Sequence, residues 1–302
     1  MIDDNIGNII IPDISVNYNI KINSLYFLIR EKTKEWFLSY EFFDKKKELK
    51  YLKQDFTLFA CLTYPYCNKE NLRNISDFYH WLWIIDDISE KYGSNVIEME
   101  CFFNNILDEN NNGKYSASLY DIINRMKLSK KDEKDFINEI SKYIKGTINR
   151  SNNVYNDKIT IKQYILVRRE NSAVNIVFWH IKYCLSSLSS LSKNIIEYKE
   201  EFEKLLNLFD DYISISNDIL SFKKEYIDGD MNIVMIMHKY YNYSIQKSID
   251  ESFKLLNDIL NQFNDISKEL SNMNKYLEEV ILAMKYWISG YLIWTKNSPR
   301  YN

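Results

Sequence analysis

The chain has 302 residues, of which 46% are hydrophobic and 27% are charged, enough apolar material for a large core. Its 39 basic and 42 acidic side chains give a formal net charge of -3, which argues against a nucleic-acid partner held by a broad positive face. Only 6 Gly and 3 Pro occur, too few turn residues for a many-stranded sandwich or barrel, so an all-β fold is excluded.

Apolar residues recur at helical spacing along the chain. One such stripe consists of Phe202, Leu205, Leu206, Phe209 and Ile213. Further helical stretches are predicted at about Ile22–Phe42, Leu72–Tyr92, Val96–Leu107, Phe136–Ile148, Ile161–Leu191, Ile245–Phe263 and Tyr276–Trp294. We therefore expect roughly ten helices and an all-α fold.

Several residues mark where these helices begin and end. Gly93 and Gly229 each follow a helical run, where a left-handed cap is expected, and Ser129 with Asp132 resembles a capping box. Residues 108–113 (DENNNG) read as a solvated loop. No composition shift or linker divides the chain, so we expect one helical domain over residues 21–302 after an N-terminal tail of residues 1–20.

The cysteines and histidines predict no metal site. Cys61, Cys67, Cys101 and Cys184 lie in apolar stretches without a metal-binding spacing, and are expected to be reduced core residues of a cytoplasmic protein. The histidines are His80, His180 and His238, too far apart in sequence to suggest a shared ion. Residues 1–16 show no secretory signal, and no apolar run is long enough for stable membrane insertion.

A first candidate for chemistry lies at the end of the helical run FYHWLWIIDDISEKYG. Asp86 and Glu90 are four residues apart, so both carboxylates lie on one helix face, and Asp87 points about 100° away. Clustered carboxylates repel each other unless a cation joins them, and Mg²⁺ prefers such oxygen ligands. The alternative is a solvated acidic helix end, which would oppose the helix dipole.

A second and more specific candidate is the segment SNDILSFKKEYIDGD. Asn217, Ser221 and Glu225 recur every four residues, so an amide oxygen, a hydroxyl and a carboxylate line one helix face. This oxygen-only set suits Mg²⁺ that shares its other coordination sites with an anionic ligand. Alternatively, the three are polar residues on a solvated helix face.

With these two motifs, the sequence resembles a microbial-type class I terpene synthase over about residues 50–302. That family carries a DDxx(D/E) motif on one helix and an NDxxSxxxE motif on another, at a separation that fits this chain. Arg300 and Tyr301 match the family's terminal RY pair, and YILVRRENSA matches the segment with its diphosphate-sensing arginine. The tandem Arg168/Arg169 leaves the register open by one residue, and the spacing to Ala173 favours Arg169.

The resemblance implies a Mg²⁺-dependent enzyme with three ions that ionises a linear prenyl diphosphate, most simply farnesyl diphosphate, to a carbocation. It implies that Asp86 and Glu90 bind two ions with help from Asp87, and that Asn217, Ser221 and Glu225 bind the third. The donors to the diphosphate would be Arg169, Lys224, Arg300 and Tyr301, and the carbonyl of Ala173 would face the ionising substrate. As a catalyst acting on a small molecule, the protein is expected to be a monomer or a homodimer without a nucleic-acid partner.

A carbocation requires a pocket without nucleophiles, lined by aromatic faces that stabilise the cation. Trp83 lies one turn before Asp86, Phe56 lies in the preceding helical stretch, and Trp294 lies just before the terminal pair. We expect these three rings to line the pocket, although aromatic stripes at helical spacing usually belong to the core.

Two other functions remain open at this level. A chain-elongating prenyl diphosphate synthase shares the substrate class, but should carry two DDxxD motifs, and the second motif here is NDxxSxxxE. A non-catalytic isoprenoid-binding protein would be expected to have lost metal ligands, and no expected ligand type is missing. Both features favour ionisation of the substrate.

Overall fold

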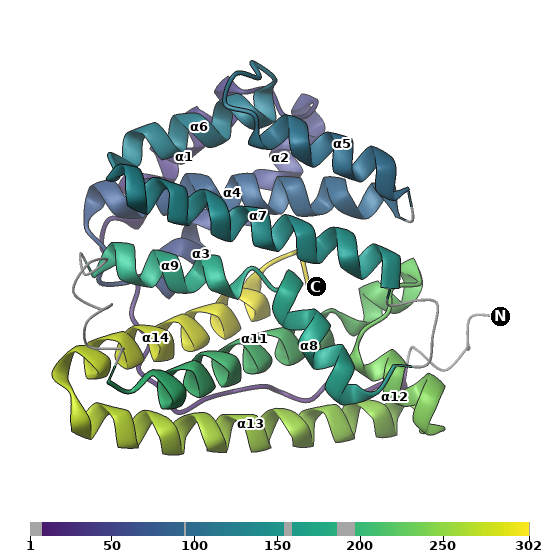
Figure 1. The fold of residues 1–302 in the computed structure, drawn as a ribbon. Helices are drawn as coiled ribbons and strands as arrows, with labels where there is room; N and C mark the ends of the chain where they lie inside the picture. Colours follow the sequence, from purple (N-terminus) through teal and green to yellow (C-terminus); the bar gives the residue numbers. More distant parts are fainter. Residues whose placement is uncertain (1–7, 94, 154–158, 186–196, 302) are drawn as a thin grey trace.

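The computed structural model describes residues 8–93, 95–153, 159–185 and 197–301. These residues contain helices and no strand, which confirms the all-α prediction. The helices, labelled as in Figure 1, are α1 (Tyr26–Ser39), α2 (Lys45–Leu52), α3 (Phe56–Thr63), α4 (Lys69–Tyr92), α5 (Val96–Leu107), α6 (Lys114–Met126), α7 (Lys130–Asn153), α8 (Ile161–Asn171), α9 (Val174–Cys184), α11 (Lys199–Asp228), α12 (Ile233–Tyr241), α13 (Ile245–Met273) and α14 (Lys275–Asn297).

The helices stack in layers, with α4 and α7 above α9, α11 and α14 and with the long α13 below them (Figure 1). Their buried apolar side chains form one cluster that extends from Ile9 to Trp294. Some helices approach closely where a side chain is missing. A Cβ at Gly290 of α14 would lie 2.5 Å from the carbonyl oxygen of Leu62 in α3, so only glycine permits this approach.

Local sequence signals predicted several helix ends. Gly93 and Gly229 follow the last residues of α4 and α11 with φ of +50° and +79°, but only Gly229 adopts the predicted left-handed cap, because the ψ of Gly93 is -119°. The backbone N–H of Asp132 donates to the Ser129 hydroxyl at 3.2 Å at the start of α7, and residues 108–113 lie outside helices as expected.

The predicted continuous stretch Ile161–Leu191 is wrong. The chain breaks at Ser172 and Ala173 between α8 and α9, and residues 186–191 lie outside the described residues. Apolar residues continue at helical spacing through the break, so periodicity does not reveal it. The chain changes direction at the break between α8 and α9 (Figure 1), and Ser172 and Ala173 at this break line a cavity.

The N-terminal segment is held against the helices in its described part. The N–H of Ile10 donates to Gln246 Oε1 at 2.9 Å, and the hydroxyl of Tyr18 donates to Asn264 Oδ1 at 2.6 Å. Both acceptors are on α13. The predicted tail is therefore packed along this helix from residue 8 onward.

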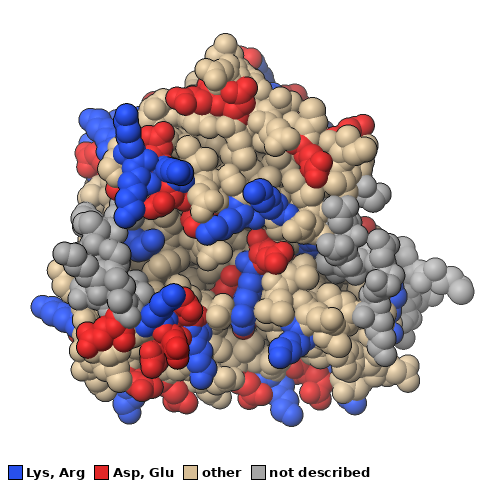
Figure 2. Space-filling model, viewed as in Figure 1, with Lys and Arg blue, Asp and Glu red and all other residues tan. Residues whose placement is uncertain are grey.

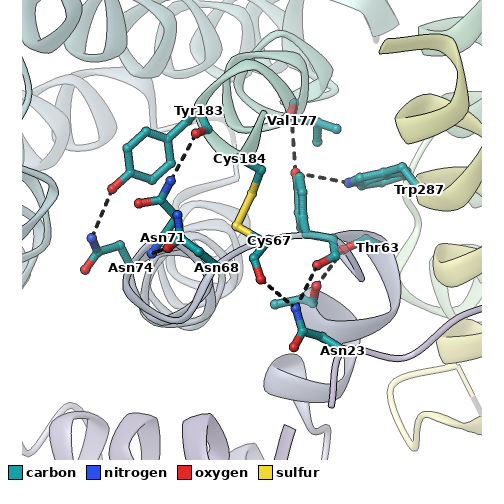
Figure 3. The surroundings of a disulfide bond; sticks show 12 residues. Asn23, Thr63, Cys67, Asn68, Asn71, Asn74, Val177, Tyr183, Cys184 and Trp287 are labelled. Atoms are coloured by element: carbon teal, nitrogen blue, oxygen red, sulfur yellow. Dashed lines mark hydrogen bonds between the residues drawn. A yellow bond between two sulfur atoms is a disulfide. The ribbon is translucent and has the colours of Figure 1, made fainter. Parts of the chain in front are cut away.

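Two of the four cysteines are not reduced, which corrects the sequence-based prediction. Cys67, just before α4, forms a disulfide with Cys184, the last residue of α9 (Figure 3). Cys61 is free and buried as expected, whereas Cys101 is free and exposed. The prediction failed because the two bonded cysteines are 117 residues apart in sequence, and only the packing of α9 against α4 brings them together.

Candidate active site

A cavity of about 380 Å³ lies among α4, α7, α8, α9, α11 and α14. Its volume is typical of small-molecule sites. The predicted first motif borders it from α4, the second from α11, and the terminal pair from the end of the chain. The two helices that carry the motifs thus contribute to one site, as the sequence predicts.

Three carboxylates meet at the C-terminal end of α4. Asp86, Asp87 and Glu90 each offer an oxygen, and these oxygens all lie within 4.8 Å of one another. Burial and the nearby Asp86 carboxylate raise the pKa of Glu90 to about 7. This accumulation of negative charge is relieved by a bound cation, so the donor set fits a hard divalent ion.

The second motif is pre-ordered by hydrogen bonds on α11. The Ser221 hydroxyl lies 2.7 Å from Glu225 Oε1, and Asn232 Nδ2 donates to Glu225 Oε2 at 2.8 Å. Burial raises the pKa of Glu225. Asn217, two turns earlier, borders the same cavity. The three oxygen ligands predicted from spacing therefore share one face, as a metal site requires.

Cationic side chains lie between the two motifs. Arg300 Nη2 is 2.8 Å from Asp87 Oδ1 and 3.6 Å from Asp86 Oδ2, and Lys224 Nζ is 3.9 Å from Glu90 Oε2. Basic and acidic side chains are interspersed on the face of the molecule shown in Figure 2. The positive charges of Arg300 and Lys224 lie directly beside the first motif, where they can bind an anion together with a metal ion.

The terminal pair contacts both motifs. Arg300 bonds to the first motif, and the Tyr301 hydroxyl accepts a hydrogen bond from Asn217 Nδ2 at 2.8 Å. Tyr301 is also one of the residues that line the cavity. The end of the chain therefore bridges α4 and α11 across the site.

The structure corrects the predicted position of the arginine on α8. Arg168 lines the cavity, and its Nη2 lies 3.5 Å from Asn217 Oδ1, while its Nε lies 3.2 Å from Asp218 Oδ1. Arg169 does not line the cavity and forms a two-pronged pair with Asp211 instead, at 2.7 Å for each hydrogen bond. Neighbouring residues on a helix point about 100° apart, and here Arg168 points to the cavity while Arg169 points to Asp211.

Ala173 lies at the cavity as predicted, at the break that precedes α9. Its φ of +61° is in the left-handed region, which is uncommon for a residue other than glycine. The chain therefore turns here between α8 and α9, and the Ala173 carbonyl accepts hydrogen bonds from the N–H groups of Ile176 and Val177 in the first turn of α9. Ser172, just before it, also borders the cavity.

Only one of the three predicted rings lines the cavity. Trp83 does, whereas Phe56 and Trp294 form a second layer behind it. Phe56 stacks on Trp83 with ring centroids 4.3 Å apart, and the Trp294 indole N–H donates to the carbonyls of Gln54 and Asp55. These hydrogen bonds hold the Trp294 ring away from the cavity, and Trp83 lies between the cavity and the rings of Phe56 and Trp294.

Several lining residues were missed or left unranked by sequence reasoning. Phe59 and Trp287 face the cavity, as do Tyr79 and Tyr143. Tyr79 could have been found, because it lies one turn before Trp83 on the same face of α4. Tyr143 could not, since it lies on α7, a helix without a motif. Its hydroxyl donates to Asp86 Oδ1 at 2.9 Å.

The comparisons with known proteins agree with this geometry. The family model described as terpene synthase family 2, C-terminal metal binding, matches residues 77–262, more than half of the chain. A protein named sesquiterpene synthase 14 from Postia placenta is 25% identical, with 93% of this chain and 83% of the relative covered. A germacrene A synthase from Nostoc punctiforme is 24% identical, with 98% and 96% covered.

Solved structures show the same fold. Germacradien-4-ol synthase from Streptomyces citricolor superposes with a TM-score of 0.81 at 17% identity, over 95% of this chain and 99% of that one. In the described part of the chain, no helix is both long and apolar enough to cross a membrane. The matched residues 77–262 contain both metal-binding motifs that border the cavity, and the chain therefore belongs to the terpene synthase family and is an enzyme that acts as a terpene cyclase.

Proposed function

We propose that this enzyme ionises farnesyl diphosphate in a Mg²⁺-dependent reaction and releases a sesquiterpene hydrocarbon or alcohol together with diphosphate. The observation that carries the proposal is that two oxygen-rich motifs and several cationic side chains border one cavity, whose lining also includes the aromatic rings of Phe59, Tyr79, Trp83, Tyr143, Trp287 and Tyr291. The motifs and the cationic side chains suit an anionic leaving group, and the aromatic rings suit a carbocation.

The residues present fit three Mg²⁺ ions. Asp86 and Glu90, assisted by Asp87, would hold two of them, and Asn217, Ser221 and Glu225 would hold the third. Mg²⁺, when bound, neutralises the charge of the diphosphate and so makes it a better leaving group. The clustered oxygens of the first motif support this assignment, because they offer the hard oxygen donors that Mg²⁺ prefers in one place.

The chain's own donors complete the binding of the diphosphate. Arg168, Lys224 and Arg300 border the cavity as cations, and Tyr301 offers a hydroxyl. The planar guanidinium groups can donate two parallel hydrogen bonds to phosphate oxygens. Arg168 takes the role that the sequence assigned to Arg169, because only its side chain reaches the cavity.

The aromatic wall excludes water and stabilises positive charge. Phe59 contacts both Trp83 and Trp287, with ring centroids 4.9 Å and 5.5 Å away. All three line the cavity. Their faces attract a cation without forming a bond to it.

The proposed chain length rests on the relatives. The relative from Postia placenta is named sesquiterpene synthase 14, and a sesquiterpene has the fifteen carbons of the farnesyl group. We therefore favour farnesyl diphosphate over the C10 and C20 substrates.

The test is to incubate the purified protein with geranyl, farnesyl or geranylgeranyl diphosphate, with and without Mg²⁺, and to analyse the extract by gas chromatography with mass detection. We expect a Mg²⁺-dependent C15 terpene from farnesyl diphosphate. Products from another chain length would overturn the substrate assignment. Longer prenyl diphosphates formed after addition of isopentenyl diphosphate would instead indicate chain elongation.

A further inference from the structure

An acidic pair on α11 contacts the broken helix from below. Asp210 and Asp211 lie seven and six residues before Asn217. Both side chains are almost fully buried, with exposed fractions of 5% and 6% for the two residues. Neither lines the cavity. Buried carboxylates without partners are costly, so the groups that bond to them show what the pair does.

Asp211 holds the last turn of α8. Arg169 Nε donates to Asp211 Oδ1 and Nη2 donates to Oδ2, each at 2.7 Å, which is the geometry of a two-pronged guanidinium–carboxylate pair. Because Asp211 of α11 holds the Arg169 side chain, the rotation of α8 about its axis is fixed as well. The adjacent Arg168 is then directed into the cavity, about 100° around the helix.

Asp210 holds the start of α9. The Ser172 hydroxyl donates to Asp210 Oδ2 at 3.0 Å and accepts a hydrogen bond from the N–H of Val174 at 3.2 Å. Ser214 Oγ donates to the other oxygen of Asp210 at 2.9 Å. The N-cap residue of α9, Ala173, has no side-chain cap of its own. Asp210 therefore holds Ser172, whose hydroxyl accepts the Val174 N–H at the start of α9 in place of a cap from Ala173.

The opposite side of the break is closed by α7. A Cβ at Gly146 would lie 2.1 Å from the carbonyl oxygen of Glu170, so α7 and the last turn of α8 are in backbone contact there. Together with the two hydrogen-bonded carboxylates, this contact confines the break on both sides. A non-glycine residue held at positive φ, such as Ala173, needs such surroundings, because this conformation is sterically unfavourable.

We propose that Asp210 and Asp211 are positioning residues that set the orientation of Arg168 toward the substrate and hold the chain break at Ala173 beside it. The inference rests on the proposed function, in which Arg168 binds the diphosphate. The two carboxylates and the metal-ligating Asn217 lie on the same helix, about two turns apart, so one rigid element aligns the broken helix with the second metal motif.

A double-mutant cycle tests the inference. Asp211→Asn, Arg168→Gln and the double variant are compared for binding of inorganic diphosphate with Mg²⁺, by calorimetry, and for kcat and KM with farnesyl diphosphate. We expect each single variant to lower diphosphate affinity about tenfold, and the double variant to be no weaker than Arg168→Gln alone, because Asp211 acts through Arg168. Losses that multiply to about a hundredfold would contradict the proposal.

The controls separate positioning from stability. Asp77→Asn on α4 removes a buried carboxylate that pairs with two arginines, Arg73 and Arg125, away from the cavity, and should lower the thermal midpoint while leaving diphosphate affinity unchanged. If Asp211→Asn fails to fold, Arg169→Lys can be tested instead, because it keeps the positive charge but cannot form both hydrogen bonds to Asp211. We expect a smaller loss of diphosphate affinity in this variant. Wild-type affinity in Arg169→Lys would then overturn the proposal.

The two hypotheses fail in different ways. If Arg168→Gln binds diphosphate as tightly as the wild type, the assignment of Arg168 under the proposed function is wrong. If Arg168→Gln is impaired and a folded Asp211→Asn variant is not, the proposed function stands and the positioning role is refuted.

Discussion

A tyrosine hydroxyl outside both motifs contacts Asp86, the first of the proposed metal ligands. Tyr143 is buried and donates to Asp86 Oδ1 at 2.9 Å. Groups that hydrogen-bond to a ligating carboxylate orient it, and their loss typically weakens metal binding by about 10–100-fold. We expect Tyr143→Phe to raise the Mg²⁺ concentration for half-maximal turnover roughly tenfold. A Mg²⁺ titration of the rate measures this.

The matched control is Tyr120→Phe. Its hydroxyl donates to the carbonyl of Leu107 at 2.7 Å, away from the cavity. This variant should keep the wild-type Mg²⁺ dependence. The same dependence in Tyr143→Phe would show that the hydroxyl does not orient Asp86.

His180 makes the folded state sensitive to acid. It is fully buried among aromatic rings, and neither ring nitrogen has a hydrogen-bond partner among the described residues. Burial lowers the pKa of His180 to about 3. Above pH 6.5 the ring is neutral in both states, and below it only the unfolded chain takes up the proton, so stability falls between about pH 6.5 and 3.

His180→Phe should therefore flatten the loss of stability in this pH range, by an amount on the order of 4 kcal/mol at its lower end. Urea unfolding at pH 7, 5.5 and 4.5 measures the change. Trp179→Phe, which alters the packing beside His180 without removing a titratable group, should shift the free energy of unfolding equally at each pH. An unchanged pH dependence in His180→Phe would rule out this histidine as the source.

The choice between Arg168 and Arg169 shows where reasoning from sequence stops at the residue scale. Both precede Ala173 at a plausible distance, and both belong to the same short helix. The distinction depends on Asp211, which is 42 residues later and selects Arg169 as its partner. No local pattern contains that information, whereas the spacing within each metal motif is purely local.

At the scale of single helices, we expect that the proposed metal ligands can be removed from α4 or α11 without unfolding the protein. The predicted ligands lie on well-ended helices, with Asn68 capping α4 at its start and Gly229 following α11. Asp86→Ala and Asn217→Ala should each abolish turnover while leaving the helical circular dichroism and the thermal midpoint nearly unchanged. Lys223→Ala, at an exposed position of α11, should behave as the wild type. Full activity in either ligand variant would refute the metal assignment.

Helix positions were predictable to the extent that one face is apolar. The stripe from Phe202 to Ile213 lies in α11, and Val96–Leu107 has the predicted ends. The break at Ser172 was not predictable, because the residues that stabilise it belong to α7 and α11. Phe56 and Trp294 were placed in the cavity for a related reason, since sequence distance to a motif does not tell first-layer from second-layer rings.

At the scale of the whole molecule, the disulfide ties two distant parts of the core together. Around it, Asn71 Nδ2 donates to the carbonyl of Tyr183, and the Tyr183 hydroxyl accepts from Asn74 (Figure 3). A cross-link over this long a loop typically contributes about 2–4 kcal/mol to stability. We expect reduction by dithiothreitol to lower the thermal midpoint by roughly 4–8 °C.

Calorimetry with and without reductant measures this shift, and alkylation of the denatured, unreduced protein should detect two thiols. Cys67→Ser should have the lower midpoint in both conditions, whereas Cys101→Ser, at an exposed free thiol, should still respond to the reductant. Four reactive thiols in the unreduced protein would show that the cysteines are reduced, as the sequence had suggested.

The same bond gives the chain a covalent topology that its linear sequence does not display. The closed ring from Cys67 to Cys184 contains α4, with the first metal motif, and Arg168, while α11 and the terminal pair lie outside it. A protease that cuts the exposed loop at residues 108–113 therefore opens the ring without separating its two pieces. Such a nicked molecule would migrate as one species until its disulfide is reduced, with both halves of the cavity still attached to each other.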